Sequence, residues 1–124
     1  MNKRALLLLP VVTVVAAGGA NAAVHSAAKT TVRTKADPNG NLAFTKKKLS
    51  APAGKVTIKM KNPMGSFTDH GIAIQIGKTK KKGRVVSPGS SSSVTAKLKP
   101  GTYTFFCPVS GHRAGGMKGT LTVR

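Results

Sequence analysis

A short run near the end of the chain brings together three side chains that bind soft metal ions. Residues 107–117 are Cys-Pro-Val-Ser-Gly-His-Arg-Ala-Gly-Gly-Met, so four residues separate Cys107 from His112 and four more separate His112 from Met117. A thiolate, an imidazole and a thioether on one loop favour copper over harder divalent ions. Such a site needs one further nitrogen ligand, and His70 is the best candidate for it.

The four side chains differ in what they would contribute to a copper ion. Cys107 would give the strong bond as a thiolate, because the charge of the metal deprotonates it. His70 and His112 would complete a plane as neutral imidazoles, and Met117 would make a long, weak axial contact. This mixture lies between the preferences of copper(I) and copper(II), so little nuclear motion would accompany a change of charge. These residues therefore predict one type 1 copper ion.

Other sites built from the same residues explain less of the sequence. Zinc would accept Cys107 and two histidines, but a structural zinc site takes four nitrogen or thiolate ligands, and a thioether suits zinc poorly. A binuclear copper centre needs a second cysteine, and Cys107 is the only one. A nucleophilic Cys-His pair leaves Met117 unexplained. Met64 is a weaker axial candidate than Met117, because a flexible methionine more often fills a core or covers a site.

The first 22 residues have the pattern of an export signal. Lys3 and Arg4 precede an apolar run over residues 5–17, and Ala20-Asn21-Ala22 has the form of a cleavage site. The run is short for a membrane span, and an uncleaved N-terminal anchor is the alternative. We expect a signal peptide at 1–22, a flexible basic segment at 23–40 and a copper-binding domain at 41–124. The expected location is the periplasm or the extracytoplasmic cell surface.

The chain is strongly basic, with 21 Lys and Arg against two acids and a formal net charge of +19. Such a field attracts anions and keeps copies of the chain apart, which predicts a monomer. Nucleic acid is disfavoured by export and by the scarcity of aromatic side chains for stacking. The expected partners are acidic redox proteins, or an anionic membrane or wall surface. A solvated basic surface without a dedicated partner is the alternative.

Alternating apolar and polar residues after position 41 predict β-strands and no further helix. Turn-forming Pro, Gly and Asn separate the strands at hairpin spacing. Strands are expected at 42–49, 55–61, 70–76, 85–86, 94–98, 102–106 and 119–123, with a basic loop at 78–84. About seven short strands favour an all-β sandwich or a small barrel. The loop with the cysteine joins two of these strands and so lies at one end of the domain.

The segment 102–123, Thr-Tyr-Thr-Phe-Phe-Cys-Pro-Val-Ser-Gly-His-Arg-Ala-Gly-Gly-Met-Lys-Gly-Thr-Leu-Thr-Val, resembles the copper loop of the cupredoxins. These are blue copper proteins such as plastocyanin, azurin and auracyanin. The loop length resembles auracyanin more than plastocyanin, and residues 44–62 resemble the second and third strands of the family. The resemblance extends over about residues 30–124. It implies a Greek-key β-sandwich.

The same resemblance assigns roles to individual residues. It implies that Cys107, His112 and Met117 are copper ligands and that His70 is the upstream histidine ligand. One departure is visible, because many cupredoxins have Asn directly after that histidine and this chain has Gly71. Groups around the ligands tune a metal site. The resemblance therefore does not fix the reduction potential or the rigidity of a site that has Gly71 at this position.

The ligand set and the resemblance together predict an exported mononuclear blue copper protein. It would carry single electrons between redox partners and would not be an enzyme. By the resemblance, His112 lies near the surface as the electron port, within an apolar docking patch of Pro108, Val109 and Ala114. A periplasmic protein that stores or delivers copper with the same ligands is the main alternative. A metal-free basic adhesin is a third hypothesis.

Overall fold

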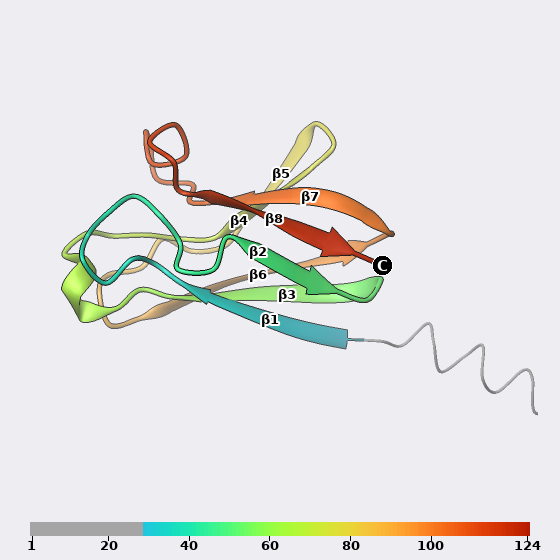
Figure 1. Cartoon of the computed structure of the whole chain (residues 1–124), viewed down its shortest axis with the longest axis horizontal. Helices are drawn as coiled ribbons and strands as arrows, with labels where there is room; N and C mark the ends of the chain where they lie inside the picture. Colours follow the sequence, from blue (N-terminus) through green and yellow to red (C-terminus); the bar gives the residue numbers. More distant parts are fainter. Residues whose placement is uncertain (1–28) are drawn as a thin grey trace, which may run out of the picture.

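The computed structural model describes residues 29–124, which fold into two packed β-sheets (Figure 1). The eight strands are β1 (Lys29–Lys35), β2 (Lys48–Ala51), β3 (Gly54–Lys61), β4 (Ala73–Ile76), β5 (Thr79–Lys82), β6 (Ser91–Leu98), β7 (Gly101–Phe106) and β8 (Lys118–Val123). A short 3-10 turn, η1 (Met64–Ser66), is the one helical element of this range. Residues 29–124 contain no helix of the length and apolarity that a membrane crossing requires. The expected signal peptide lies outside the described residues.

The strands are divided between a three-stranded and a five-stranded sheet. The smaller sheet has the order β1-β3-β6, and the larger has the order β2-β8-β7-β4-β5. The β1–β3 and β2–β8 pairs are parallel, and the other pairs are antiparallel. Figure 1 shows β7 and β8 in a layer above β1, β3 and β6. The all-β sandwich expected from the sequence is confirmed.

The core between the sheets follows from the alternation of side chains along each strand. In β3, Val56, Ile58 and Met60 point inward and are at most 1% exposed, whereas the lysines beside them are exposed. Phe105 of β7 meets Phe44 in this core, with ring centroids 5.3 Å apart and planes tilted by 48°. Removing these apolar side chains from water holds the two sheets face to face.

Two basic segments form strands where none was expected. The flexible segment expected at 23–40 is wrong for residues 29–35, which form β1 and pair with β3. The folded part of the chain therefore begins at least twelve residues before the expected boundary at 41. The basic loop expected at 78–84 is also wrong, since β5 pairs there with β4. Every residue of β5 is exposed, so no apolar alternation marks it as a strand.

Other expected strands are shorter in the structure. The strand expected at 42–49 overlaps β2 only at residues 48 and 49. Phe44 makes only an isolated bridge to Ala36. The strand expected at 70–76 begins at Ala73. His70 lies before it, in an isolated bridge to Val86 that replaces the short strand expected at 85–86. The predicted ligand His70 is therefore held by a loop-to-loop bridge rather than by a sheet.

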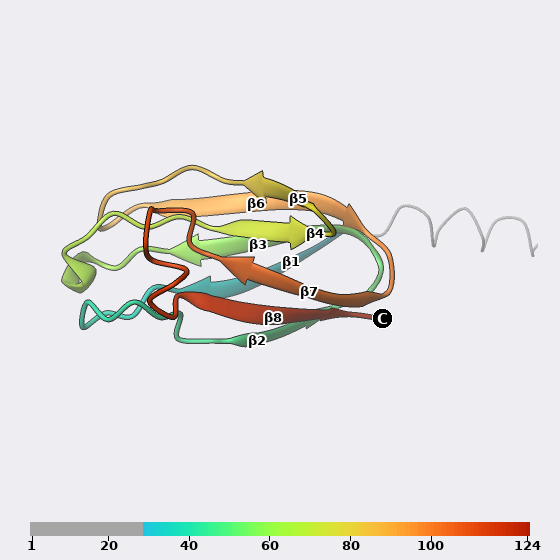
Figure 2. The same ribbon diagram turned by 90° about the horizontal axis from the view of Figure 1, so that it is seen from above.

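The loops that carry the predicted ligands lie at one end of the sandwich, which we call the ligand pole. Figure 2 shows the β7–β8 loop and the segment between β3 and β4 at the end opposite the C-terminus. β1 begins at the other end of the sandwich, the end at which the C-terminus also lies. The ligand pole is thus well separated from the point at which the chain enters the fold.

The contact between the two core phenylalanines gives a test of this packing. Phe105→Ala should lower the free energy of unfolding by about 3–5 kcal/mol, since it removes a fully buried ring and leaves a cavity. Thr104→Ala, one residue earlier on the other face of β7, should change it by less than about 0.5 kcal/mol. Urea unfolding followed by circular dichroism measures both values. Equal losses for the two variants would contradict the assigned core.

Candidate metal centre

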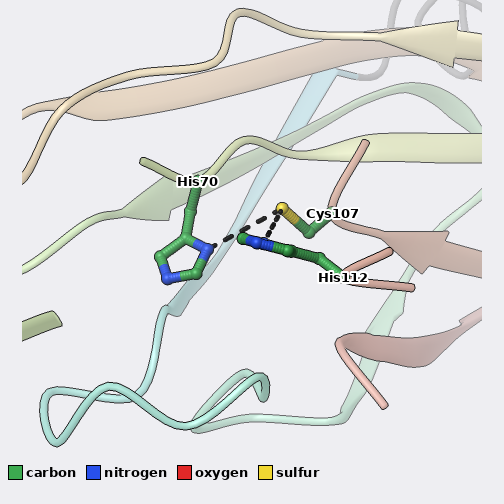
Figure 3. A group of neighbouring side chains, drawn as sticks. All are labelled: His70, Cys107 and His112. Atoms are coloured by element: carbon green, nitrogen blue, oxygen red, sulfur yellow. Dashed lines mark hydrogen bonds between the residues drawn. The ribbon is translucent and has the colours of Figure 1, made fainter. Parts of the chain in front are cut away.

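Three of the four predicted ligands converge on one point of the ligand pole (Figure 3). Nδ1 of His70 lies 3.8 Å from Sγ of Cys107, and Nδ1 of His112 lies 3.6 Å from the same sulfur. The donor atoms of the three residues all lie within 4.8 Å of one another. The two imidazole rings have centroids 5.1 Å apart and are tilted by 60°. The residues come from two separate loops, so the tertiary fold creates this cluster.

The β7–β8 ladder places the two sulfur side chains opposite each other. The ladder ends with the pairing of Phe106 and Lys118, and the Cys107 amide then donates to the Met117 carbonyl at 3.0 Å, which continues the same register. Directly opposed residues of an antiparallel pair have Cβ atoms about 5 Å apart on one face of the sheet. Cys107 and Met117 are both fully buried in the core. Register therefore brings the thioether side chain to the face that holds the thiol.

The loop between these residues winds back so that His112 reaches the sulfur. The His112 amide donates to the Val109 carbonyl, and the Met117 amide donates to the His112 carbonyl, both at 3.0 Å. Gly111 and Gly116 have φ angles of 81° and 114°, which side chains rarely allow. These bonds and bends fix the loop without help from a regular strand.

Arg113 fastens the same loop to the five-stranded sheet. Its guanidinium carbon lies 4.0 Å above the centre of the Phe106 ring, an attractive cation–π arrangement. Its Nη1 also donates to Oε1 of Gln75 at 3.2 Å. Because Arg113 directly follows His112, these two contacts restrict the position of the imidazole.

The opposite side of the cluster depends on Asn62, a residue that sequence reasoning assigned only to a turn. Its side-chain amide donates to the carbonyls of Thr68 and Val86, both at 2.9 Å. The Val86 carbonyl also accepts from the His70 amide at 3.1 Å. Asn62 is fully buried, so it ties together the two loops that present His70. The available sequence signal was a polar residue in the inward register of β3, two positions beyond Met60 and directly after Lys61.

Burial shifts the proton affinities of the two buried donors in opposite directions. The pKa of His70 is lowered, first by loss of water and then by the His112 imidazole, while Asp69 acts the other way. The pKa of the Cys107 thiol is raised by burial, and hydrogen bonds from the Gly71 and Val109 amides offset part of this rise. Burial therefore favours the neutral imidazole of His70 and the protonated thiol of Cys107 in the absence of metal. Metal binding must displace the thiol proton.

The donor atoms have the spacing and the chemistry that a copper ion needs. Metal bonds to thiolate sulfur and imidazole nitrogen are about 2.3 and 2.0 Å long in the well-characterised zinc sites. Laid end to end, one bond of each kind exceeds the sulfur–nitrogen separations of 3.8 and 3.6 Å, so one ion can bridge the sulfur and either imidazole nitrogen. One thiolate, two imidazoles and a nearby thioether make up a soft donor set that favours copper.

Comparison with known proteins agrees with this geometry. A family model described as copper-binding proteins of the plastocyanin/azurin family matches residues 19–124. The chain belongs to this family. The cofactor of this cupredoxin is copper, and His70, Cys107, His112 and Met117 form an arrangement like that of a type 1 copper site.

Auracyanins are among the similar proteins. Auracyanin-B of Chloroflexus aurantiacus is 50% identical over 40 residues, which are 32% of this chain and only 17% of that protein. A solved structure of auracyanin B gives a TM-score of 0.66 at 28% identity, with 77% of this chain and 88% of the other covered. Reduced auracyanin from Roseiflexus castenholzii gives 0.63 at 29% identity, with coverage of 79% and 98%. These similarities support the cupredoxin-like sandwich.

Gly71 departs from the asparagine that many cupredoxins carry, and the structure gives a steric reason. A Cβ atom at this position would lie 2.8 Å from the Arg84 carbonyl oxygen and 3.3 Å from the Pro108 ring. No side chain fits there without movement of backbone. The Gly71 amide nevertheless donates to Sγ of Cys107 at 3.4 Å. The backbone thus supplies a hydrogen bond to the sulfur from this position.

Two further residues near His70 do not join the cluster. Met64, the weaker axial candidate, is 72% exposed, so it neither fills the core nor lies with the buried donors. Its sulfur instead approaches the backbone at Gly89. Asp69 is exposed, and within residues 29–124 no hydrogen bond joins its carboxylate to His70. Met117 is therefore the methionine whose position suits an axial contact.

The role of Asn62 can be measured through stability and colour together. Asn62→Ala should lower the free energy of unfolding by about 2–4 kcal/mol, because two carbonyls lose their buried donor. It should also weaken the visible absorption of the copper-loaded protein, since His70 is no longer held by its loops. The control is Asn41→Ala, which removes an exposed amide bonded to Asp37. If both variants unfold at the same urea concentration, Asn62 does not organise the site.

The close packing at Gly71 gives a second test. Gly71→Ala should cost about 1–3 kcal/mol of stability because the new methyl group pushes on the Pro108 ring and the Arg84 carbonyl. The displaced amide should stabilise the thiolate less, so the reduction potential of the copper-loaded protein should fall. Voltammetry measures the potential, and Thr68→Ala in the same loop is the control. A potential unchanged from that of the control would show that the amide does not tune the sulfur.

Proposed function

We propose that this protein carries single electrons by means of one copper ion held by His70, Cys107, His112 and Met117. The observation that supports this most strongly is the convergence of one buried sulfur and two Nδ1 atoms within 4.8 Å. A bound copper ion would supply a reversible change between copper(I) and copper(II). The chain supplies the ligands and excludes water, and it needs no chemical substrate. Electron transfer, rather than catalysis, accounts for such a closed donor set.

The chain's own residues explain how such a site stays rigid. Cys107 is pinned by the Met117 carbonyl and the Gly71 amide. His70 is fixed by its bridge to Val86, and His112 by the turns of its loop. Because each ligand is held through the backbone, a change of charge at the metal would move the protein little. A small reorganisation favours fast electron transfer.

His112 is the ligand best placed to pass electrons. It is partly exposed, whereas His70, Cys107 and Met117 are fully buried. Of the residues expected to form a docking patch around it, Ala114 is exposed and Pro108 and Val109 are half-buried, which supports this role. Electrons would then cross from His112 to a partner that covers this patch.

The structure adds apolar surface that the sequence did not predict. Three large apolar side chains are exposed on the segments that flank His70, namely Met64 at 72%, Phe67 at 85% and Val85 at 49%. Exposed apolar side chains that gather near a functional group favour protein contact. We include these three residues in the proposed docking surface for a redox partner.

The basic charge bears on the kind of partner and on location. A formal charge of +19 would speed association with an acidic redox protein, and the rate would fall as salt increases. Export to the periplasm or the extracytoplasmic surface is supported by the pattern of residues 1–22. A monomer is consistent with the mutual repulsion of such chains.

Copper reconstitution followed by a visible spectrum tests the function directly. The loaded protein should be intensely blue, should bleach and recover on one-electron reduction and oxidation, and should unfold at higher temperature than the metal-free protein. Cys107→Ser should abolish the colour, and Met117→Leu should alter it. Met64→Leu, which changes the exposed methionine, should leave it unchanged.

Two results would overturn the proposal. A blue Cys107→Ser variant would exclude the ligand set. A colourless copper(I) form that passes its metal to an acceptor protein, without a stable copper(II) state, would establish copper delivery instead.

A further inference from the structure

The outer face of the three-stranded sheet carries a dense array of cations, which we call the cationic face. Alternate residues of each strand point outward here, and those with charge are all exposed. They are Lys29, Arg33 and Lys35 on β1, Lys55, Lys59 and Lys61 on β3, and Lys97 on β6. The other outward positions carry hydroxyl groups at Thr31, Thr57, Ser91, Ser93 and Thr95.

No acid offsets these charges. The chain has two acids, Asp37 and Asp69, and both belong to loops rather than to this sheet. Asp37 accepts bonds from the Asn39 amide and the Asn41 side chain within its own turn. Asp69 directly precedes His70 at the ligand pole. The cationic face is therefore of one sign throughout.

The strand register places like charges directly beside one another. Lys29 pairs with Lys55, Arg33 with Lys59 and Lys35 with Lys61 across β1 and β3, and Lys55 also pairs with Lys97 of β6. Like charges directly opposed on one face of a sheet destabilise it.

Protection of a sheet edge against aggregation accounts for lysines on an edge strand such as β1. It does not account for the three lysines on β3, which is the central strand. A repulsive array on a central strand points to an anion that relieves the repulsion by binding.

The array extends in two dimensions. Rows of outward residues lie about 6.8 Å apart along the strands, and the strands lie about 4.8 Å apart. Near one end of the face Lys46 joins Arg33, Lys35, Lys59 and Lys61 around an open groove of about 620 Å³.

A second hollow lies toward the other end of the cationic face. There Lys81 of β5 joins Lys29 and Lys55 beside the threonine side chains. Cations are therefore present toward both ends of the cationic face.

We propose that the cationic face docks on the surface of an anionic phospholipid membrane. A planar array of cations matches a planar array of phosphate headgroups, whereas a linear polyanion would contact only one row at a time. Each Lys or Arg near an anionic bilayer contributes attraction, and the contributions accumulate. The face has no outward apolar side chain, so the contact is superficial and electrostatic and does not involve insertion. It should be released as salt shortens the screening length.

This orientation leaves the metal site accessible. The ligand pole lies at one end of the sandwich, and the cationic face lies along its side (Figures 1 and 2). When the cationic face lies against the membrane, the long axis of the sandwich is parallel to the membrane. The β7–β8 loop at the ligand pole then points along the membrane surface. It could meet a partner on the same surface without leaving the membrane. The membrane contact does not depend on the proposed electron transfer, because none of its residues is a metal ligand.

Vesicle binding by two matched variants tests the proposal. The face variant Lys55→Gln/Lys59→Gln/Lys61→Gln removes three charges from the central strand. The control variant Lys48→Gln/Lys80→Gln/Lys118→Gln removes three exposed charges from the five-stranded sheet. Both variants are produced in the same host and loaded with copper. Any processing of residues 1–28 is then the same in both and cannot account for a difference in vesicle binding. Co-sedimentation is measured with phosphatidylcholine vesicles, with vesicles containing phosphatidylglycerol, and with soluble polyphosphate as a competitor.

The expected result is binding to the phosphatidylglycerol vesicles that is lost at high salt. The face variant should bind about a hundredfold more weakly, and the control variant less than about fivefold more weakly. The face variant should unfold at the same or a higher temperature than the parent protein, because it loses only repulsive pairs, and this shows that it is folded.

Three results would overturn the proposal. Equal losses in the two variants would mean that net charge alone drives binding. Equal binding to pure phosphatidylcholine would mean that the contact is not electrostatic. Face-dependent binding of polyphosphate without binding to vesicles would identify a soluble polyanion as the occupant instead.

Discussion

The hydrogen bond from the Cys107 amide to the Met117 carbonyl is the constraint on which the metal site depends. This bond extends the β7–β8 pairing by one residue on each strand. The loop therefore leaves the sheet and returns to it at directly opposed residues. The two sulfur side chains then share the inner face, and the loop between them has only to return His112 to the thiol. His70 arrives from the other side, through the Asn62 network and the Gly71 amide. Backbone hydrogen bonds therefore hold the site, together with the side chains of Asn62 and Arg113.

What the sequence could predict follows from how local each feature is. The copper ligands were predictable because three of them lie on one short loop, and β3 because Val56, Ile58 and Met60 alternate cleanly. β1 and β5 were missed because their pairing partners, rather than apolar alternation, make them strands. Asn62 was missed for a similar reason, since its amide is satisfied by carbonyls of two loops that only the tertiary fold brings together. The steric need for glycine at position 71 was not predictable either, because only the fold brings Pro108 and Arg84 close to it.

The two sheets have different chemical character. The five-stranded sheet provides β4, β7 and β8, whose ends lead into the segments that carry the ligands. The three-stranded sheet contributes apolar side chains to the core and cations to the outside. Because strand alternation separates these two sides, the outer residues of β1, β3 and β6 can change in charge without altering the core. The charge of the outer surface can therefore vary in this fold without disturbing the positions of the metal-site residues.

The basic surface and the metal site still influence each other electrostatically. With the thiol proton displaced, a copper(I) site is neutral and a copper(II) site carries one positive charge. The field of a chain with a formal charge of +19 therefore favours the reduced form. Asp69, the acid next to His70, is exposed and opposes this bias only weakly across solvent. Anions bound to the cationic face would offset the field and make the copper(II) form easier to reach. Docking on an anionic surface would in this way be coupled, by charge alone, to the tendency of the copper site to release an electron.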